Sequence, residues 1–126
     1  SSVPFSYLGK KKEYQIARIE QIEQIRRTEY SLYLDVLQQM INESNRDNFL
    51  LLQKSTNRLL LFAGPELSTI INEYYNTIIN NANAGKPTLN HEHISYQTKI
   101  VNAMRSELGV STIELDQVRF IGAPLQ

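Results

Sequence analysis

The longest uninterrupted stretch of the chain, residues 10–42, reads KKKEYQIARIEQIEQIRRTEYSLYLDVLQQMIN. It contains neither glycine nor proline, the two residues that most often interrupt helices, so a single helix of about 50 Å is predicted at about 1.5 Å per residue. In its second half, apolar side chains recur at spacings of three and four, which indicates one face for a core. That face consists of Tyr30, Tyr33, Leu34, Leu37, Met40 and Ile41.

The first half of this predicted helix follows a different pattern. Tyr14 is followed by four isoleucines at strict steps of three, Ile16, Ile19, Ile22 and Ile25. Each step falls about 60° short of a full turn, so the apolar stripe winds around a helix that is otherwise charged. These side chains need cover, from the domain's own core or from another chain. We expect another chain, because the remaining predicted helices are too short to reach them.

Three further helices are predicted, over residues 46–63, 65–80 and 90–108. We expect Gly64 to close the first of these, Pro65 to occupy the first position of the next, Asn90 to cap the last and Gly109 to close it. Residues 46–63 are apolar on more than one side, which predicts a central, widely buried helix. Residues 111–117 are predicted to form a short helical turn, followed by an extended piece.

These elements predict an all-α fold, a small antiparallel bundle of about four helices whose long first helix projects past the others over residues 10–28. Residues 10–126 would form one domain, preceded by a tail at residues 1–9. A chain of 126 residues leaves room for one core.

Composition narrows the classes of function. Thirteen basic and thirteen acidic residues give zero net charge, which argues against nucleic-acid binding. The absence of cysteine excludes disulfides, thiolate zinc sites and cysteine catalysis. No run approaches the roughly 18 apolar residues of a membrane span.

No catalytic, cofactor or metal site is predicted. His91 and His93 are two residues apart, about 200° around a helix, so we expect them to be solvated. Arg58 and Arg105 either form buried ion pairs with Glu66, Glu73 or Glu107, or reach water from the polar faces of their helices, and we expect the second.

The basic cluster Lys10, Lys11 and Lys12 follows the apolar stretch Val3–Leu8. That order is typical of the cytoplasmic end of a membrane helix, and lysines there would contact anionic lipid head groups. The alternative is a frayed tail before a solvated helix start. Both interpretations stay open at this point.

Four segments resemble a group of bacterial proteins in which one membrane helix precedes a charged helix and a small cytoplasmic helical domain. These segments are residues 26–30, 58–66 with 70–74, 103–109, and 118–121. The resemblance implies an architecture, with a membrane anchor upstream of a domain on the cytoplasmic side. It implies no activity, cofactor or catalytic residue.

Together these observations predict a non-enzymatic interaction or scaffolding domain that forms a homo-oligomer through Tyr14, Ile16, Ile19, Ile22 and Ile25. One alternative is an accessory subunit that binds a different protein through the same helix. Another is a small-ligand binder, or an enzyme, with a site near Tyr74, Tyr75, Tyr96 and Arg105. A third is a peripheral binder of membrane surfaces through Lys10–Lys12.

Overall fold

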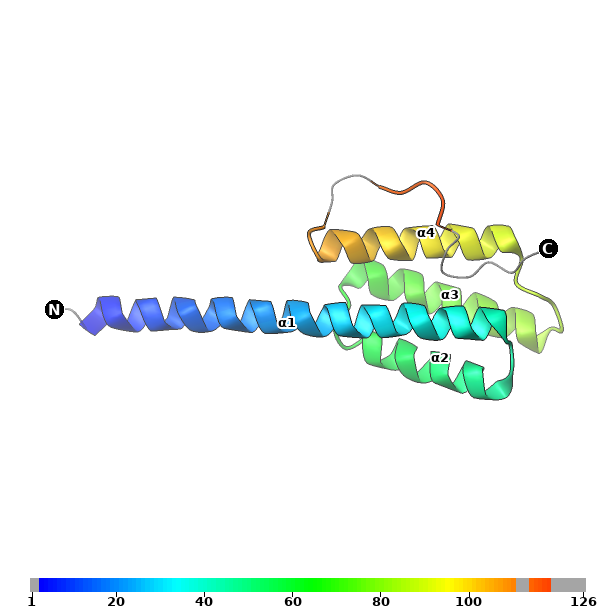
Figure 1. The fold of residues 1–126 in the computed structure, drawn as a ribbon, viewed down its shortest axis with the longest axis horizontal. Helices are drawn as coiled ribbons and strands as arrows, with labels where there is room; N and C mark the ends of the chain where they lie inside the picture. Colours follow the sequence, from blue (N-terminus) through cyan, green and yellow to red (C-terminus); the bar gives the residue numbers. More distant parts are fainter. Residues whose placement is uncertain (1–2, 111–113, 119–126) are drawn as a thin grey trace.

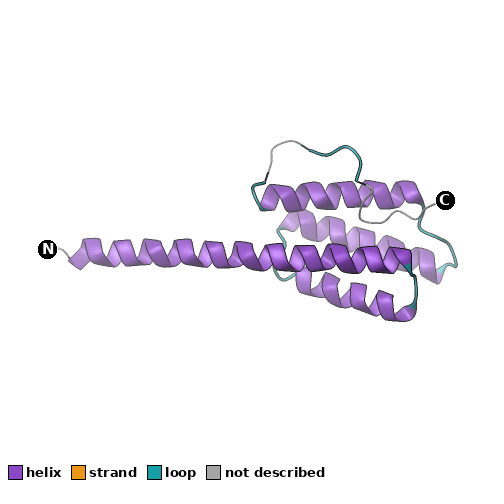
Figure 2. Ribbon diagram, in the orientation of Figure 1, coloured by secondary structure: helices purple, strands orange, loops and turns teal. Residues whose placement is uncertain are grey.

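The computed structural model describes residues 3–110 and 114–118, and of residues 3–6 the backbone alone. It contains four helices, α1 (Val3–Asn42), α2 (Arg46–Leu59), α3 (Pro65–Asn83) and α4 (Asn90–Glu107). The three shorter helices run alternately up and down beside the C-terminal half of α1, while its N-terminal half projects (Figure 1). Within the described residues there is no strand (Figure 2). The predicted all-α bundle with a long first helix is confirmed.

Helix α1 is longer than predicted, since it begins at Val3 and not at Lys10. Pro4 lies in its first turn, where a missing N–H removes no helical hydrogen bond. Gly9 is therefore an interior helical residue. Most of the segment that we expected to be a tail continues the helix.

The turn between α2 and α3 also differs from the prediction. Helix α2 ends at Leu59, and residues 60–62 form a turn. Gly64 does not close α2 in a left-handed conformation, because its φ is −68° and it is the N-cap of α3. Pro65 occupies the start of α3 as predicted.

Helix α4 differs from the prediction at its N-terminal end and agrees with it at its C-terminal end. Its N-cap is Leu89 and not Asn90, and the Glu92 carboxylate accepts a hydrogen bond from the Leu89 N–H at 3.2 Å. Gly109 closes the helix with φ +64°, as predicted, and the Val110 N–H reaches the Arg105 carbonyl at 3.0 Å. Glycine suits this position because it adopts positive φ without strain.

All four helices contribute to one core. The residues that α1 was predicted to bury are buried, except that Leu34 is half-buried. Residues 114–118 also pack on this core. Asn102 forms two hydrogen bonds with the backbone of Leu115, at 2.8 and 2.9 Å, and Val118 is fully buried. No helical turn forms at residues 114–117, and residues 111–113 and 119–126, where the rest of that prediction falls, lie outside the described part of the chain.

The prediction of a central, widely buried α2 is wrong. Leu52, Thr56 and Leu59 face the core, whereas Leu50 and Leu61 are 50% and 77% exposed. Helix α2 packs on one side only, against α1 and α3. Its exposed leucines, Leu50 and Leu51, belong to the outer surface of the bundle.

Candidate interaction surface

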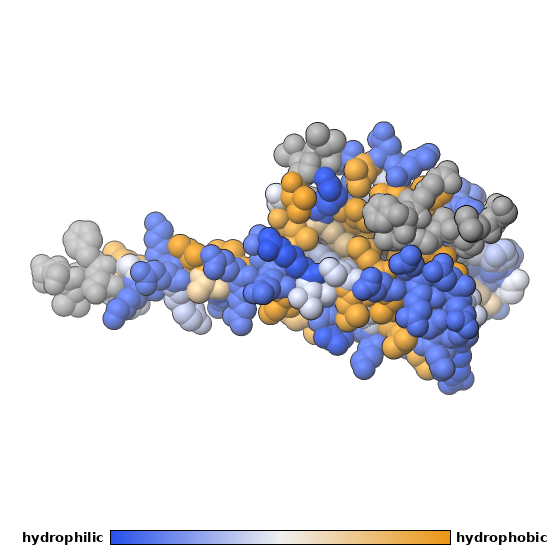
Figure 3. All heavy atoms as spheres, in the orientation of Figure 1, coloured by the Kyte–Doolittle hydropathy of each residue, from blue (hydrophilic) through white to orange (hydrophobic). Residues whose placement is uncertain are grey.

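Residues 7–28 of α1, which we call the arm, extend beyond the bundle. The arm is about 32 Å long at about 1.5 Å per residue. Figure 3 shows hydrophobic patches along it, set among hydrophilic residues. The exposed fractions are 68% for Tyr14, 50% for Ile16, 64% for Ile19 and 39% for Ile22, and Ile25 is half-buried.

The arm continues the face of α1 that forms the core. Ile19 precedes the fully buried Leu37 by five full turns, and Ile22 precedes the buried Tyr33 by about three. The two isoleucines therefore point in the direction in which the bundle covers α1 further along. The bundle ends near residue 28, but the apolar face of α1 does not.

Polar contacts fix the base of the arm to the bundle. Arg26 Nε donates to the carbonyl oxygen of Phe62, in the turn after α2, at 2.8 Å. One turn further along α1, the buried carboxylate of Glu29 accepts a charge-assisted hydrogen bond from Arg58 at 2.6 Å. Two successive turns of α1 are thus tied to α2 and the turn that follows it.

Glu107 supplies the other half of this attachment. Its Oε2 accepts a hydrogen bond from the Tyr30 hydroxyl, and its Oε1 accepts the Gly64 N–H at 2.7 Å. Burial, together with the neighbouring carboxylate, raises the pKa of Tyr30 well above its usual range, so the hydroxyl keeps its proton and donates it. The arm therefore leaves the bundle from a fixed base.

Lys10, Lys11 and Lys12 are all exposed near the tip of the arm. Three consecutive helical positions span about 200° of the circumference, so the ammonium groups form a collar and not a single face. Tyr7 and Leu8, next to them, are 66% and 60% exposed.

His93 contradicts the prediction of a solvated pair, whereas His91 is exposed as expected. His93 is 5% exposed, and its Nδ1 lies 2.5 Å from the Tyr74 hydroxyl, which also accepts a hydrogen bond from Gln97 at 3.1 Å. Burial lowers the pKa of His93, which favours the neutral ring. Sequence reasoning missed the burial of His93 because its partner, Tyr74, lies 19 residues away on α3.

The two arginines behave differently from each other. Arg58 forms an ion pair, which was the less favoured of the two predictions. Its partner is Glu29 and not Glu66, Glu73 or Glu107. Its side chain is 51% exposed, so it also reaches water. Arg105 is half-buried, and its buried Nε has no hydrogen-bond partner among the described residues.

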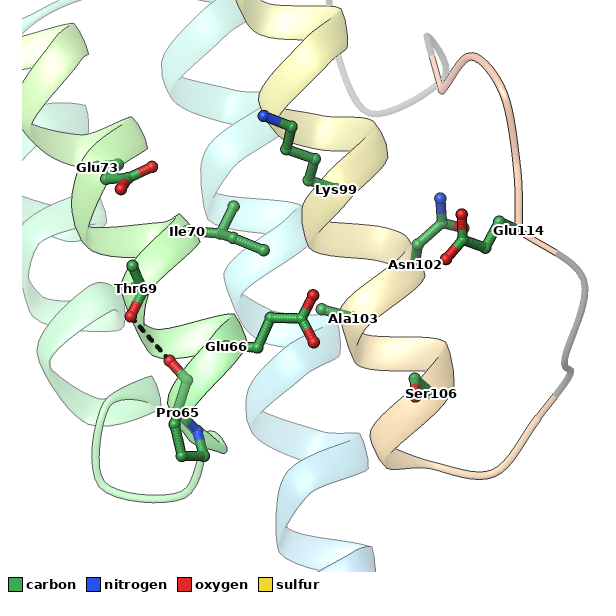
Figure 4. Close-up of a pocket in the computed structure, with 10 residues that line it drawn as sticks. All are labelled: Pro65, Glu66, Thr69, Ile70, Glu73, Lys99, Asn102, Ala103, Ser106 and Glu114. Atoms are coloured by element: carbon green, nitrogen blue, oxygen red, sulfur yellow. Dashed lines mark hydrogen bonds between the residues drawn. The ribbon is translucent and has the colours of Figure 1, made fainter.

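The tyrosines of the small-ligand alternative line neither of the two cavities described below. Tyr74 is fully buried, and its ring stacks on Tyr96 with centroids 5.0 Å apart. The described surface instead has a groove of about 730 Å³ between α3 and α4, shown in Figure 4. Glu66, Glu73 and Glu114 border it together with Lys99, and the three carboxylates are exposed. A smaller cavity of about 340 Å³ lies near the C-terminal end of α1.

Within residues 3–110 and 114–118, the acidic and histidine side chains form no group of three that could hold a metal ion. None of the described helices is both long and apolar enough to cross a bilayer. Comparison of the chain with models of protein families, with curated proteins and with solved structures finds no match. The resemblance to membrane-anchored bacterial proteins stays a prediction.

Proposed function

We propose that this protein is a non-enzymatic interaction domain that self-associates through Tyr14, Ile16, Ile19, Ile22 and Ile25 as a helical pair. The observation that carries the proposal is the continuation of the core-facing side of α1 onto the arm. Ile19 and Ile22 lie in line with buried core residues but are themselves exposed. A second helix on that face would remove their apolar surface from water, which drives association.

The charges of the arm favour an antiparallel pair. A parallel pair would bring the lysine collars of both copies together, which is repulsive. An antiparallel pair centred near Ala17 moves the two lysine collars to opposite ends and places each at the height of Glu23 of the other copy. It also keeps the two bundles at opposite ends. The proposed assembly is thus a rod with a bundle at each end.

Light scattering after size exclusion tests the assembly. We expect the full chain to be a dimer and a version that begins at Thr28 to be a folded monomer. A double variant, Ile19→Glu with Ile22→Glu, should also be monomeric. The matched control, Ala17→Glu with Gln24→Glu, adds the same charges on the opposite face of α1 and should remain a dimer. A monomeric full chain would overturn the proposal and leave the arm to a different protein.

Cross-linking tests the orientation, and the absence of native cysteine leaves no background. Lys11→Cys and Ile22→Cys proteins are mixed and oxidised. An antiparallel pair should give mainly the mixed disulfide, because positions 11 and 22 face each other across the pair. A parallel pair should give each protein linked to itself, which would contradict the antiparallel arrangement.

A second candidate function, contact with an anionic membrane surface, rests on the exposed lysine collar beside Tyr7 and Leu8. Each lysine would contribute about 1 kcal/mol near such a surface. Sedimentation with phosphatidylserine vesicles should then depend on salt and be lost when Lys10–Lys12 are replaced by glutamine. Equal sedimentation of the variant would exclude this role.

A further inference from the structure

The cavity of about 340 Å³ lies at the end of the bundle away from the arm, where α1 ends, α2 begins and the connection from α3 enters α4. Its walls are mostly apolar and include the core residues Met40, Ile41 and Ile78. Phe49, Ala82 and Pro87 complete this apolar lining. The cavity therefore borders directly on the core.

Four polar residues line the same cavity: Ser44, Lys86, Thr88 and His93. Among the described residues that line it, Lys86 is the only charged one, and none is a carboxylate. Thr88 Oγ1 accepts a hydrogen bond from Asn81 at 3.1 Å, which leaves its own proton free to donate. The lining thus offers a positive charge and a hydroxyl donor beside an apolar wall.

His93 adds a second donor. The Tyr74 hydroxyl accepts from Gln97, so its own proton is directed to His93 Nδ1. A neutral imidazole that accepts at Nδ1 carries its proton on Nε2. The buried network holds the ring in this tautomer, and His93 belongs to the cavity lining.

We propose that this cavity binds a small monocarboxylate with an apolar chain, such as a medium-chain fatty acid. The chain would lie against Met40, Phe49 and Ile78, and the carboxylate would lie near Lys86 and Thr88. The cavity is at the small end of the roughly 300–1,000 Å³ typical of ligand pockets, which sets the ligand's size. The proposal is independent of the arm, which lies at the opposite end of α1.

Fluorescence provides a direct test, because the chain contains no tryptophan. A Phe49→Trp protein carries one reporter in the cavity wall and is titrated with octanoate below its micelle-forming concentration. Octanamide, a neutral probe of nearly the same shape, is titrated in parallel. We expect saturable binding of octanoate and about tenfold weaker binding of octanamide. Chemical shifts of residues 86–88 and 93 in the unaltered protein check that the reporter has not created the site.

Variants then separate the two parts of the site. Lys86→Gln should weaken octanoate binding about tenfold and leave octanamide binding unchanged. Ala82→Phe, which replaces an exposed residue at the cavity wall, should fill the cavity and abolish binding of both probes. Lys54→Gln, an exposed lysine of α2 outside the cavity, is the control and should change neither affinity. No saturation, equal affinity for the two probes, or full binding by Ala82→Phe would overturn the proposal.

Discussion

Glu107 at the end of α4 and Tyr30 of α1 lie 77 positions apart in sequence and are joined by a hydrogen bond from the Tyr30 hydroxyl to Glu107 Oε2. The second oxygen of the same carboxylate holds the Gly64 N–H. One side chain therefore joins α1, α4 and the start of α3 at the base of the arm. This contact adds to those of Arg26 and Glu29, which also hold the base of the arm against the bundle.

Removing either partner should destabilise the fold. Tyr30→Phe leaves Glu107 Oε2 without its tyrosine donor, and Glu107→Gln removes the charge that strengthens the bond. We expect each to lower the free energy of unfolding by about 1–3 kcal/mol in urea titrations followed by circular dichroism. The double variant should lose less unfolding free energy than the sum of the two single losses, because both changes remove the same interaction. Glu66→Gln, at an exposed carboxylate, should have little effect, and additive losses would show that the two residues do not interact.

Gly64→Ala tests the same contact from the other side. The φ of Gly64 is −68°, so the backbone itself accepts alanine, but a Cβ there would collide with Glu107 Oε1. We expect a loss of about 1–3 kcal/mol in unfolding free energy in the native background and almost none on a Glu107→Ala background. Gly9→Ala is the control: it lies within α1 with no atom near the new Cβ, and should stabilise by about 0.5–1 kcal/mol. An equal loss at Gly64 in both backgrounds would show that the collision is not the cause.

The sequence predicts the positions of the helices better than it predicts which of their side chains are buried and which contact one another. Periodicity places the core face of α1 correctly, because apolar residues such as Tyr33 and Leu37 recur on one side of the helix and polar residues occupy the other. It fails for α2, because exposed and buried leucines look alike when apolar residues occupy most positions. The projection of the arm follows from the predicted helix lengths alone. The polar contacts at its base cannot be predicted in this way. Glu107, Gly64 and Tyr30 belong to separate elements, and their contact arises only from tertiary packing.

The Glu29–Arg58 pair should contribute far more than the other described ion pair on α1. Glu29 is 7% exposed, so loss of Arg58 leaves a buried carboxylate without a cation, whereas the side chains of Arg27 and Glu23 are 62% and 41% exposed. Because Arg58 itself is half exposed, solvent reduces the effect, and we expect Arg58→Gln to cost about 1–2 kcal/mol of unfolding free energy. Arg27→Gln should cost at most about 0.5 kcal/mol. Similar losses for the two variants in urea titrations would show that burial of Glu29 does not matter.

His93 should make stability depend on pH. Its pKa is lowered in the folded protein by burial, so the unfolded chain takes up a proton first as the pH falls below about 6.5. The stabilisation is therefore complete above that value and is lost progressively at lower pH, until His93 protonates in the fold as well. His93→Gln should weaken the fall in unfolding free energy between pH 7.5 and 5.5. His91→Gln, at the exposed neighbour, should leave it unchanged, and identical slopes for all three proteins would contradict the assignment.

Two leucines separated by one residue should differ sharply in their effects on stability. Leu59 is fully buried at the end of α2, whereas Leu61, in the turn that follows, is 77% exposed. Leu59→Ala removes packed methyl groups from the core and should lower the unfolding free energy by about 2–5 kcal/mol. Leu61→Ala should change it by less than about 0.5 kcal/mol. If α2 were central, as its composition indicates, both variants would be strongly destabilised. Thermal unfolding of the chain beginning at Thr28 makes the comparison independent of self-association through the arm, because that version lacks residues 14–25.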